Sequence, residues 1–149
     1  MKRLFFLITT VAISLTLLIS GCDRESGDDL TEFELSYGIG PITERVTLAD
    51  EIDPELALRG KMIFDTLCIA CHQLDAVVTA PRLRNITTQR NSEFILNYIL
   101  NPEEMSQRHP TGRQLSEEYP GVKSRLGIEQ EDAFALLEFL RLAATGETD

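Results

Sequence analysis

The chain has 149 residues, with 24 acidic and 14 basic side chains and a formal net charge of −10. That length suits one small domain, and the acidic balance argues against nucleic acid as a partner because the phosphate backbone is also negative. A domain this small has a poor ratio of volume to surface, so a disulfide, a metal or a large cofactor is expected to complete its core. Three cysteines, an odd number, cannot all pair within the chain.

Residues 1–21 have the form of an export signal. Lys2 and Arg3 provide the positive start, an apolar stretch follows, and two small residues stand directly before Cys22. This ending resembles the lipobox of bacterial lipoproteins, in which the cysteine receives a diacylglycerol, so we expect a lipoprotein signal peptide and a lipid on Cys22. The alternative is an uncleaved anchor, for which the apolar stretch is short against the roughly 20 residues that a bilayer core requires. Both interpretations place the remainder on the outer face of the cytoplasmic membrane.

Residues 22–52 are expected to be the lipidated cysteine followed by an acidic tether. Asp23 either resembles the residue that retains many lipoproteins at the inner membrane or is one more acid of the tether. Acids, serine and glycine dominate its first half and no apolar periodicity persists, so we expect little fixed structure, except for an ordered arm at 37–42. As a coil, its roughly 28 residues would span about 30 Å on average and about 90 Å when stretched.

Three main helices are expected in the working domain, residues 53–149. The first begins with Asp53 at the N-cap and Pro54 at the first helical position. The second covers residues 91–101 and the third residues 129–143, each with apolar side chains at helical spacing. No alternating strand pattern is present, so the predicted class is all-α with long loops.

Cys68, Cys71 and His72 form a C-x-x-C-H pattern where the first helix ends. Two thiols three positions apart on a helical turn can form thioethers with the two vinyl groups of one porphyrin, and the adjacent histidine then lies under the iron. We therefore expect one covalent haem c, attached through both cysteines, with His72 as an iron ligand.

Three other interpretations of these residues are weaker. A thioredoxin-like redox pair requires a βαβ setting, which the pattern lacks. A structural zinc site requires four ligands, and with Cys22 lipidated only the motif and His109 remain. A plain disulfide across two residues would close a tight ring that is seldom used for structure.

Residues 53–143 resemble the class I cytochrome c family beyond this motif. The family has a glycine and an aromatic residue before the motif, a proline-leucine element after it, a helix ending in Asn-Pro, and a terminal helix with aromatic and leucine residues. The matching residues are Gly60, Phe64, Pro81, Leu83, Asn101, Pro102, Leu137, Phe139 and Leu140. Before the proline the family usually has glycine, where this chain has Ala80, so the local turn is expected to differ slightly.

The resemblance implies a class I cytochrome c-like fold around one haem, and outer-sphere transfer of single electrons rather than enzymatic catalysis. It also implies that the carbonyl of Pro81 accepts the proton on the second imidazole nitrogen of His72. The partners would be a redox donor and acceptor, in a membrane complex or soluble. Two alternatives stay open: a haem-based sensor or catalyst that binds a gas or peroxide, and a fixed cytochrome subunit of a larger respiratory oxidoreductase.

The sixth iron ligand is where this sequence departs from the family pattern. The family's ligand methionine lies shortly before the terminal helix, which corresponds here to about Lys123, and no methionine is present there. Met62 lies on the first helix and is expected to be packing. We expect the ligand to be Met105, at the start of the long loop after the second helix, with His109, Lys123 or a vacant position as alternatives.

Charge is distributed unevenly along the chain. Removal of the signal peptide leaves a net charge of −12, whereas residues 80–126 carry seven bases and five acids. In the family these loops surround the exposed haem edge, so a redox partner is expected to meet basic side chains there. The alternative is that some of the arginines neutralise haem propionates.

Overall fold

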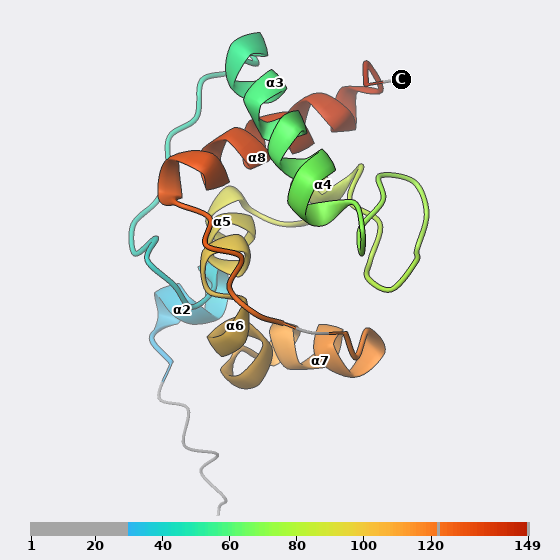
Figure 1. Cartoon of the computed structure of the whole chain (residues 1–149). Coiled ribbons are helices and arrows are strands. Elements are labelled where there is room, and N and C mark those ends of the chain that lie inside the picture. The colour runs from blue at the N-terminus through green and yellow to red at the C-terminus, as the bar shows by residue number, and fades with distance from the viewer. Residues whose placement is uncertain (1–29, 122, 149) are drawn as a thin grey trace, which may run out of the picture.

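The computed structural model describes residues 30–121 and 123–148. The regular secondary structure of these residues is helical, and they contain no strand. Helices α3 (Pro54–Ile63), α5 (Ser92–Leu100) and α8 (Gln130–Thr145) are the three expected helices. They form the frame of the domain, and the all-α prediction is confirmed (Figure 1). None of the described helices is long and apolar enough to cross a bilayer. The expected signal peptide and Cys22 lie outside the described residues.

Helix α3 starts as its sequence predicts and leads directly into the cysteine motif. The Asp53 carboxylate accepts the backbone N–H groups of Glu55 and Leu56, and Pro54 occupies the first helical position. The helix then widens into a π-helical turn, η2 (Phe64–Cys68). Cys68 is therefore held at the end of a capped and continuous helical segment.

Gly60 lies where α3 crosses α8 (Figure 1). A Cβ atom at this position would collide with the backbone carbonyl of Ala135 and lie 2.9 Å from the Cβ of Phe139. One turn later the Phe64 ring packs against the Phe139 ring, with 5.2 Å between centroids. The missing side chain allows the two helices to approach this closely, so a glycine is required here.

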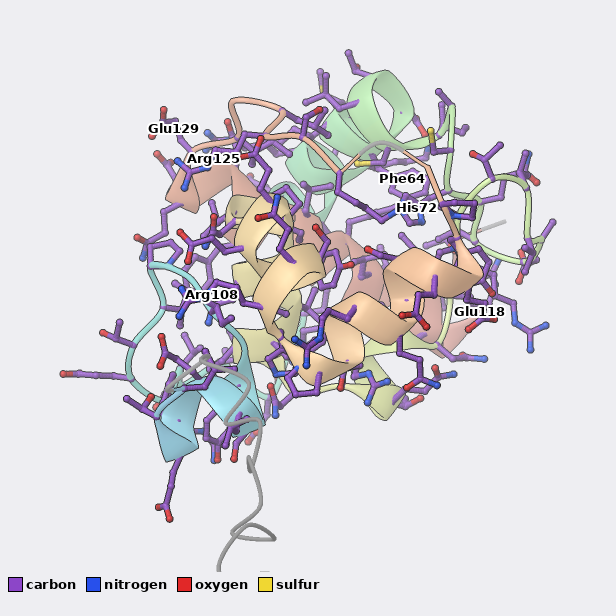
Figure 2. The ribbon with its side chains drawn as sticks, turned by 90° about the horizontal axis from the view of Figure 1, so that it is seen from below. Phe64, His72, Arg108, Glu118, Arg125 and Glu129 are labelled. Atoms are coloured by element: carbon purple, nitrogen blue, oxygen red, sulfur yellow. The ribbon has the colours of Figure 1, made fainter. Side chains whose placement is uncertain are left out.

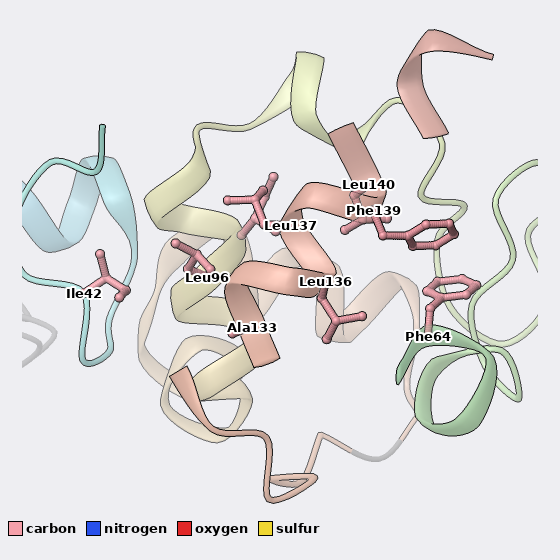
Figure 3. Packing of buried hydrophobic residues seen from close by; sticks show 9 residues of the cluster. Ile42, Phe64, Leu96, Ala133, Leu136, Leu137, Phe139 and Leu140 are labelled. Carbon is pink, nitrogen blue, oxygen red and sulfur yellow. The ribbon is translucent and has the colours of Figure 1, made fainter. Parts of the chain in front are cut away.

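One hydrophobic cluster fills the space between α3, α5 and α8. Figure 3 shows Phe64 and Phe139 at one end of it and Ile42 at the other, with Leu96 and Leu137 between them. Its buried members are Ile42, Phe64, Ile95, Leu96, Ala133, Leu136, Leu137, Phe139 and Leu140. Cys68 and Leu83 pack against this cluster, so the cysteine motif and the loop that follows it rest on the same core.

Residues 30–52, which we call the N-terminal arm, are folded against the domain. The arm contains helix α2 (Glu32–Tyr37), which begins with a capping box formed by Thr31 and Glu34. Ile39 and Ile42 are buried. The expected ordered contact at 37–42 is confirmed, whereas the expectation of little fixed structure is wrong for residues 30–50.

Asn97 on α5 holds the arm through its side-chain amide. The amide oxygen accepts the backbone N–H of Ile42 at 2.9 Å, and the amide nitrogen lies 3.0 Å from the carbonyl of Ile42 and 3.1 Å from those of Tyr37 and Gly38. Gly38 has φ of +88°, a conformation that favours glycine. These bonds satisfy backbone groups that would otherwise be buried without partners, which explains why an asparagine stands inside an apolar helix.

Glu93, one turn before Asn97, makes a second buried contact with the arm. Its carboxylate accepts the backbone N–H of Val46 and pairs with Arg45, each at 2.8 Å. Burial disfavours the charged carboxylate, but the Val46 N–H and Arg45 outweigh this, so the pKa of Glu93 is lowered. A lowered pKa in the folded state means that this contact stabilises the fold above the ordinary carboxyl pKa, and that the stabilisation is lost as pH falls through the lowered value.

The expected long loop after the second helix is instead two short helices. They are α6 (Pro102–Arg108) and α7 (Pro110–Glu118), and a further short helix, α4 (Ile86–Gln89), precedes α5. Each of the two prolines breaks the preceding helix but occupies the first turn of the next one, where its missing N–H costs nothing. The prediction of an irregular loop is therefore wrong for residues 102–118.

The close helix crossing predicts whether alanine at position 60 lowers or raises the free energy of unfolding. Gly60→Ala should destabilise the protein by about 1–3 kcal/mol, because the added methyl group meets the backbone of Ala135. An exposed helical glycine would behave in the opposite way, gaining up to about 1 kcal/mol from the higher helix propensity of alanine. Denaturant unfolding measures the difference, with the 61 % exposed Leu58→Ala on the same helix as a control. A stabilised Gly60→Ala protein would contradict the close crossing.

A second prediction concerns the arm. Asn97→Ala should cost about 1–3 kcal/mol, because the buried N–H of Ile42 loses its acceptor. Amide hydrogen exchange across residues 37–46 should accelerate more than exchange in α8. The matched control is Asn85→Ala, at an exposed asparagine whose side chain makes no capping bond. Unchanged exchange in the arm of Asn97→Ala would show that other contacts hold it.

Candidate functional site

The cysteine motif is a compact turn at the end of η2. The backbone N–H groups of Cys71 and His72 both bond to the carbonyl of Cys68, at 3.1 and 2.8 Å, and that of Ile69 bonds to Phe64 at 3.0 Å. Cys68 is half-buried and Cys71 is exposed, and both are free thiols. One rigid segment therefore presents the two sulfur atoms and the imidazole together.

The environment of Cys68 does not suit thiolate chemistry. Burial raises its pKa to about 11, and the neighbouring Cys71 contributes to this increase. Redox-active dithiols depend on a lowered thiol pKa, so this environment argues against the thioredoxin-like interpretation. The described residues also contain no group of three or more His, Cys, Asp or Glu side chains placed to hold a metal ion.

His72 is oriented by the carbonyl of Pro81. The Nδ1 atom lies 2.9 Å from that oxygen, which is the pair that the family resemblance implied. Burial lowers the pKa of His72, the contact with Pro81 opposes this, and the positive charge of Lys123 lowers it further. The net lowering favours the neutral imidazole at neutral pH. With the proton on Nδ1 donated to Pro81, Nε2 carries the lone pair that an iron ligand requires.

The loop between His72 and α4 returns Pro81 to the motif. The backbone N–H of Leu83 bonds to Gln73 at 3.0 Å, and that of Arg84 bonds to Leu74 at 2.9 Å. Arg84 forms a two-pronged ion pair with Asp75, an acid on the same loop.

The same guanidinium ties this loop to the end of α8. Arg84 donates to the carbonyl of Ala143 at 3.1 Å and to the hydroxyl of Thr148 at 3.0 Å. Sequence reasoning counted Arg84 only as one charge among several. The separation of Arg84 and Asp75 along the sequence matches neither helical nor strand periodicity, so no sequence pattern predicts that they pair.

Apolar side chains near the motif are exposed. Leu67 is 41 % exposed, Ile69 49 %, Val77 56 % and Val78 52 %. These four exposed apolar side chains lie from one residue before to ten residues after Cys68, so an apolar group bound at the motif would have apolar neighbours. Two adjacent thiols, a neutral imidazole with its second nitrogen fixed and a nearby apolar surface are the features that a covalently attached haem requires, so the residues present fit this group.

Met105, the expected sixth ligand, is not placed with the motif. It lies on α6 and is fully buried, and its sulfur accepts the backbone N–H of Ile39 at 3.0 Å. It packs with Ile39 and Phe94 in a cluster separate from the one that Cys68 joins. The expectation that Met105 lies at the start of a long loop is wrong, because the residue is part of helix α6. Ligation by Met105 would require its sulfur to leave this buried site.

His109 is buried at the junction of α6 and α7. Its Nδ1 accepts the backbone N–H of Thr111, its Nε2 lies 3.3 Å from the carbonyl of Leu35, and its ring meets Phe94 edge-on. In Figure 2 the preceding residue, Arg108, lies well away from His72. Both ring nitrogens are thus engaged between the arm and α7.

The two remaining candidates differ in their surroundings. Met62 is 65 % exposed, so the expectation that it packs in the core is wrong. Lys123 is half-buried, and its ammonium group donates to the carbonyls of Tyr119 at 2.6 Å and Gly121 at 2.9 Å. The positive charge of Lys123 contributes to the lowered pKa of His72, whereas Met62 has no charge.

Comparisons with known proteins agree with this geometry. The family model for cytochrome c matches residues 57–143. The chain belongs to the cytochrome c family. No curated protein matches it significantly.

Solved structures from Rhodothermus marinus are similar over most of the chain. A cytochrome c is 40 % identical with a TM-score of 0.72, covering 76 % of this chain and 97 % of that one. An engineered form, Rma TDE, is 41 % identical with a TM-score of 0.71, covering 75 % and 96 %. The engineered form bound to a carbene intermediate is 42 % identical with a TM-score of 0.68, again covering 75 % and 96 %.

Family membership confirms the predicted fold class and cofactor. The domain binds a covalent c-type haem, and Cys68 and Cys71 fit the attachment motif. The individual roles of His72, Pro81 and Met105 toward that haem stay predictions.

Attachment through two thioethers can be tested with the three cysteines of this chain. Replacing both Cys68 and Cys71 by alanine should make the haem extractable by acidified organic solvent, whereas the wild type should keep it. Cys22→Ala is the matched control and should keep its haem, because this thiol lies outside the attachment motif. Complete extraction of haem from the wild type, or covalent haem in the double variant, would contradict the attachment.

Proposed function

We propose that this cytochrome is a single-electron carrier that a lipid on Cys22 holds at the outer face of the cytoplasmic membrane. Haem-based electron transfer is the activity of the family, and the contact between His72 and Pro81 beside the two thiols is the observation that carries it here. The membrane attachment rests on the lipobox-like residues before Cys22. Redox proteins that donate and accept electrons are the implied partners.

The residues of the site keep the cofactor in one geometry during electron transfer. When bound, the haem supplies an iron that changes oxidation state by one electron. Cys68 and Cys71 fix the position of the porphyrin, and Pro81 fixes the ring of His72. Exposure of Cys71, Val77 and Val78 puts the attachment side of the site at the protein surface, where a partner can approach within electron-transfer distance.

Packing of the arm shortens the tether. Because residues 30–52 are folded on the domain, only residues 23–29 separate Cys22 from the first described residue. Those eight peptide steps span about 28 Å when fully extended, compared with the roughly 90 Å expected for a tether of residues 23–50. A carrier on so short a tether meets partners whose redox centres lie close to the membrane surface. This confinement suits a local shuttle and also a cytochrome that stays bound to one membrane complex.

The basic character of residues 80–126 is partly neutralised within the domain. Arg84 pairs with Asp75 and Arg108 pairs with Glu104. Arg82 is exposed and directly follows Pro81, so its charge lies beside the residue that orients His72. A partner with acidic side chains around its redox centre would meet this position beside the haem site.

The anchor can be tested in a host that attaches haem c to exported proteins. The wild type should appear in the membrane fraction with a diacylglycerol on Cys22 by mass spectrometry. Cys22→Ala should lose the diacylglycerol and keep a normal haem spectrum. Its haem should be reduced by the native membrane donor on the order of 10-fold more slowly, because the tether supplies the local concentration.

Ser26→Ala, within the same short tether, is the control and should behave as the wild type. A wild type that retains residues 1–21 without lipid would establish the uncleaved anchor instead. Equal reduction rates for Cys22→Ala and the wild type would show that the anchor does not increase the rate of electron transfer from the membrane donor.

A further inference from the structure

We propose that Lys123 supplies the sixth ligand of the haem iron. This inference rests on the haem site described above and is independent of the membrane tether. Four side chains were candidates from the sequence, and the structure gives each a different environment. Of these four side chains, Lys123 combines a position close to the loop that carries Pro81 with an amine suited to donate a lone pair.

The loop that carries Lys123 returns to the attachment loop. A Cβ atom on Gly121 would lie 3.8 Å from the carbonyl oxygen of Thr79 and 4.0 Å from the Nζ of Lys123. Thr79 is two residues from Pro81, which contacts His72. The amine of Lys123 is thus close to the part of the chain that orients the proximal imidazole.

The end of α7, from which this loop starts, agrees with this placement. In Figure 2, Glu118 at the end of α7 lies on the same side of the molecule as Phe64 and His72.

The hydrogen bonds of Lys123 match those of a ligating amine. The Nζ atom donates to two carbonyls, those of Tyr119 and Gly121. A neutral primary amine has two N–H donors and one lone pair, so both donors are satisfied and the lone pair is left for the iron. Ligation releases one proton from the ammonium group to solvent and forms one nitrogen-to-iron coordinate bond, and no atom changes oxidation state.

The rival donors are engaged elsewhere or point into solvent. The sulfur of Met105 accepts the N–H of Ile39 inside a separate cluster. The two ring nitrogens of His109 contact Thr111 and Leu35. Met62 is exposed on α3, six residues and roughly 9 Å of helix before Cys68.

A nitrogen ligand and a sulfur ligand differ in their effects on the midpoint potential and on the oxidised spectrum of the haem. Thioether ligation increases the midpoint potential and gives a weak sulfur-to-iron charge-transfer band in the oxidised spectrum. An amine lowers the potential and gives no such band. The oxidised wild-type protein is therefore expected to be low-spin without the band, and to have a lower potential than a methionine-ligated cytochrome.

The test uses holoproteins whose covalent haem is first verified on a denaturing gel. Lys123→Ala should shift the oxidised haem toward high spin and bind carbon monoxide in the reduced state at least about 10-fold faster than the wild type. Lys123→Met should remain low-spin, gain the sulfur-to-iron band and show a higher midpoint potential. Lys61→Ala is the matched control, because Lys61 is an exposed lysine on α3 that pairs with Asp65. The spectra of this variant should equal those of the wild type.

Three results would overturn the assignment. The first is a sulfur-to-iron band in the wild type that disappears in Met105→Ala. The second is a wild-type low-spin spectrum in Lys123→Ala, which would move the ligand to another nitrogen such as that of His109. The third is the absence of the band in Lys123→Met.

If Lys123→Ala does not accumulate, Lys123→Arg serves in its place. It keeps the positive charge, while the guanidinium stays protonated and does not ligate, so the low-spin spectrum must be lost in it too. Absence of covalent haem from all of these proteins would instead contradict the haem site itself.

Discussion

The contact between α3 and α8 at Gly60 sets the geometry on which the haem site depends. Because no side chain separates the helices there, Phe64 reaches Phe139 and the π-helical turn leaves α3 at a defined point above the core. Cys68 ends that turn and packs on the same cluster. The far end of α8 bonds to Arg84, which closes the attachment loop around Pro81. One helix pair therefore positions both the thiols and the carbonyl that orients His72.

The proximal and distal sides of this site follow the family pattern to different degrees. On the proximal side, the attachment motif and the contact between His72 and Pro81 agree with the family resemblance. On the other side, the sequence position at which the family usually has its ligand methionine corresponds here to about Lys123. The methionine nearest to it along the described chain, Met105, instead accepts the backbone N–H of Ile39 and helps to hold the N-terminal arm. A soft sulfur donor is thus used for packing, while the Lys123 amine lies close to the loop that carries Pro81.

Sequence patterns predicted the parts of this molecule that depend on local chemistry. Asp53 and Pro54 mark a helix start through bonds to the next few residues, and C-x-x-C-H combines three functional groups within five positions. The arm could not be predicted in the same way, because Asn97 bonds to residues 55 to 60 positions away. Two polar residues, Glu93 and Asn97, inside the apolar run of α5 were the available signal. Pro102 was misleading because a proline that ends one helix can also begin another.

We propose that the protein is a one-electron carrier and that side chains of this chain would supply both the fifth and the sixth ligands of the haem iron. Spectroelectrochemical titration of the full-length holoprotein, with and without carbon monoxide, tests it most directly. We expect one reversible transition of a single electron, with the same midpoint potential and the same reduced spectrum in both conditions. A reduced haem that binds carbon monoxide rapidly, with an increase in the midpoint potential, would contradict it and favour a gas-binding sensor or catalyst.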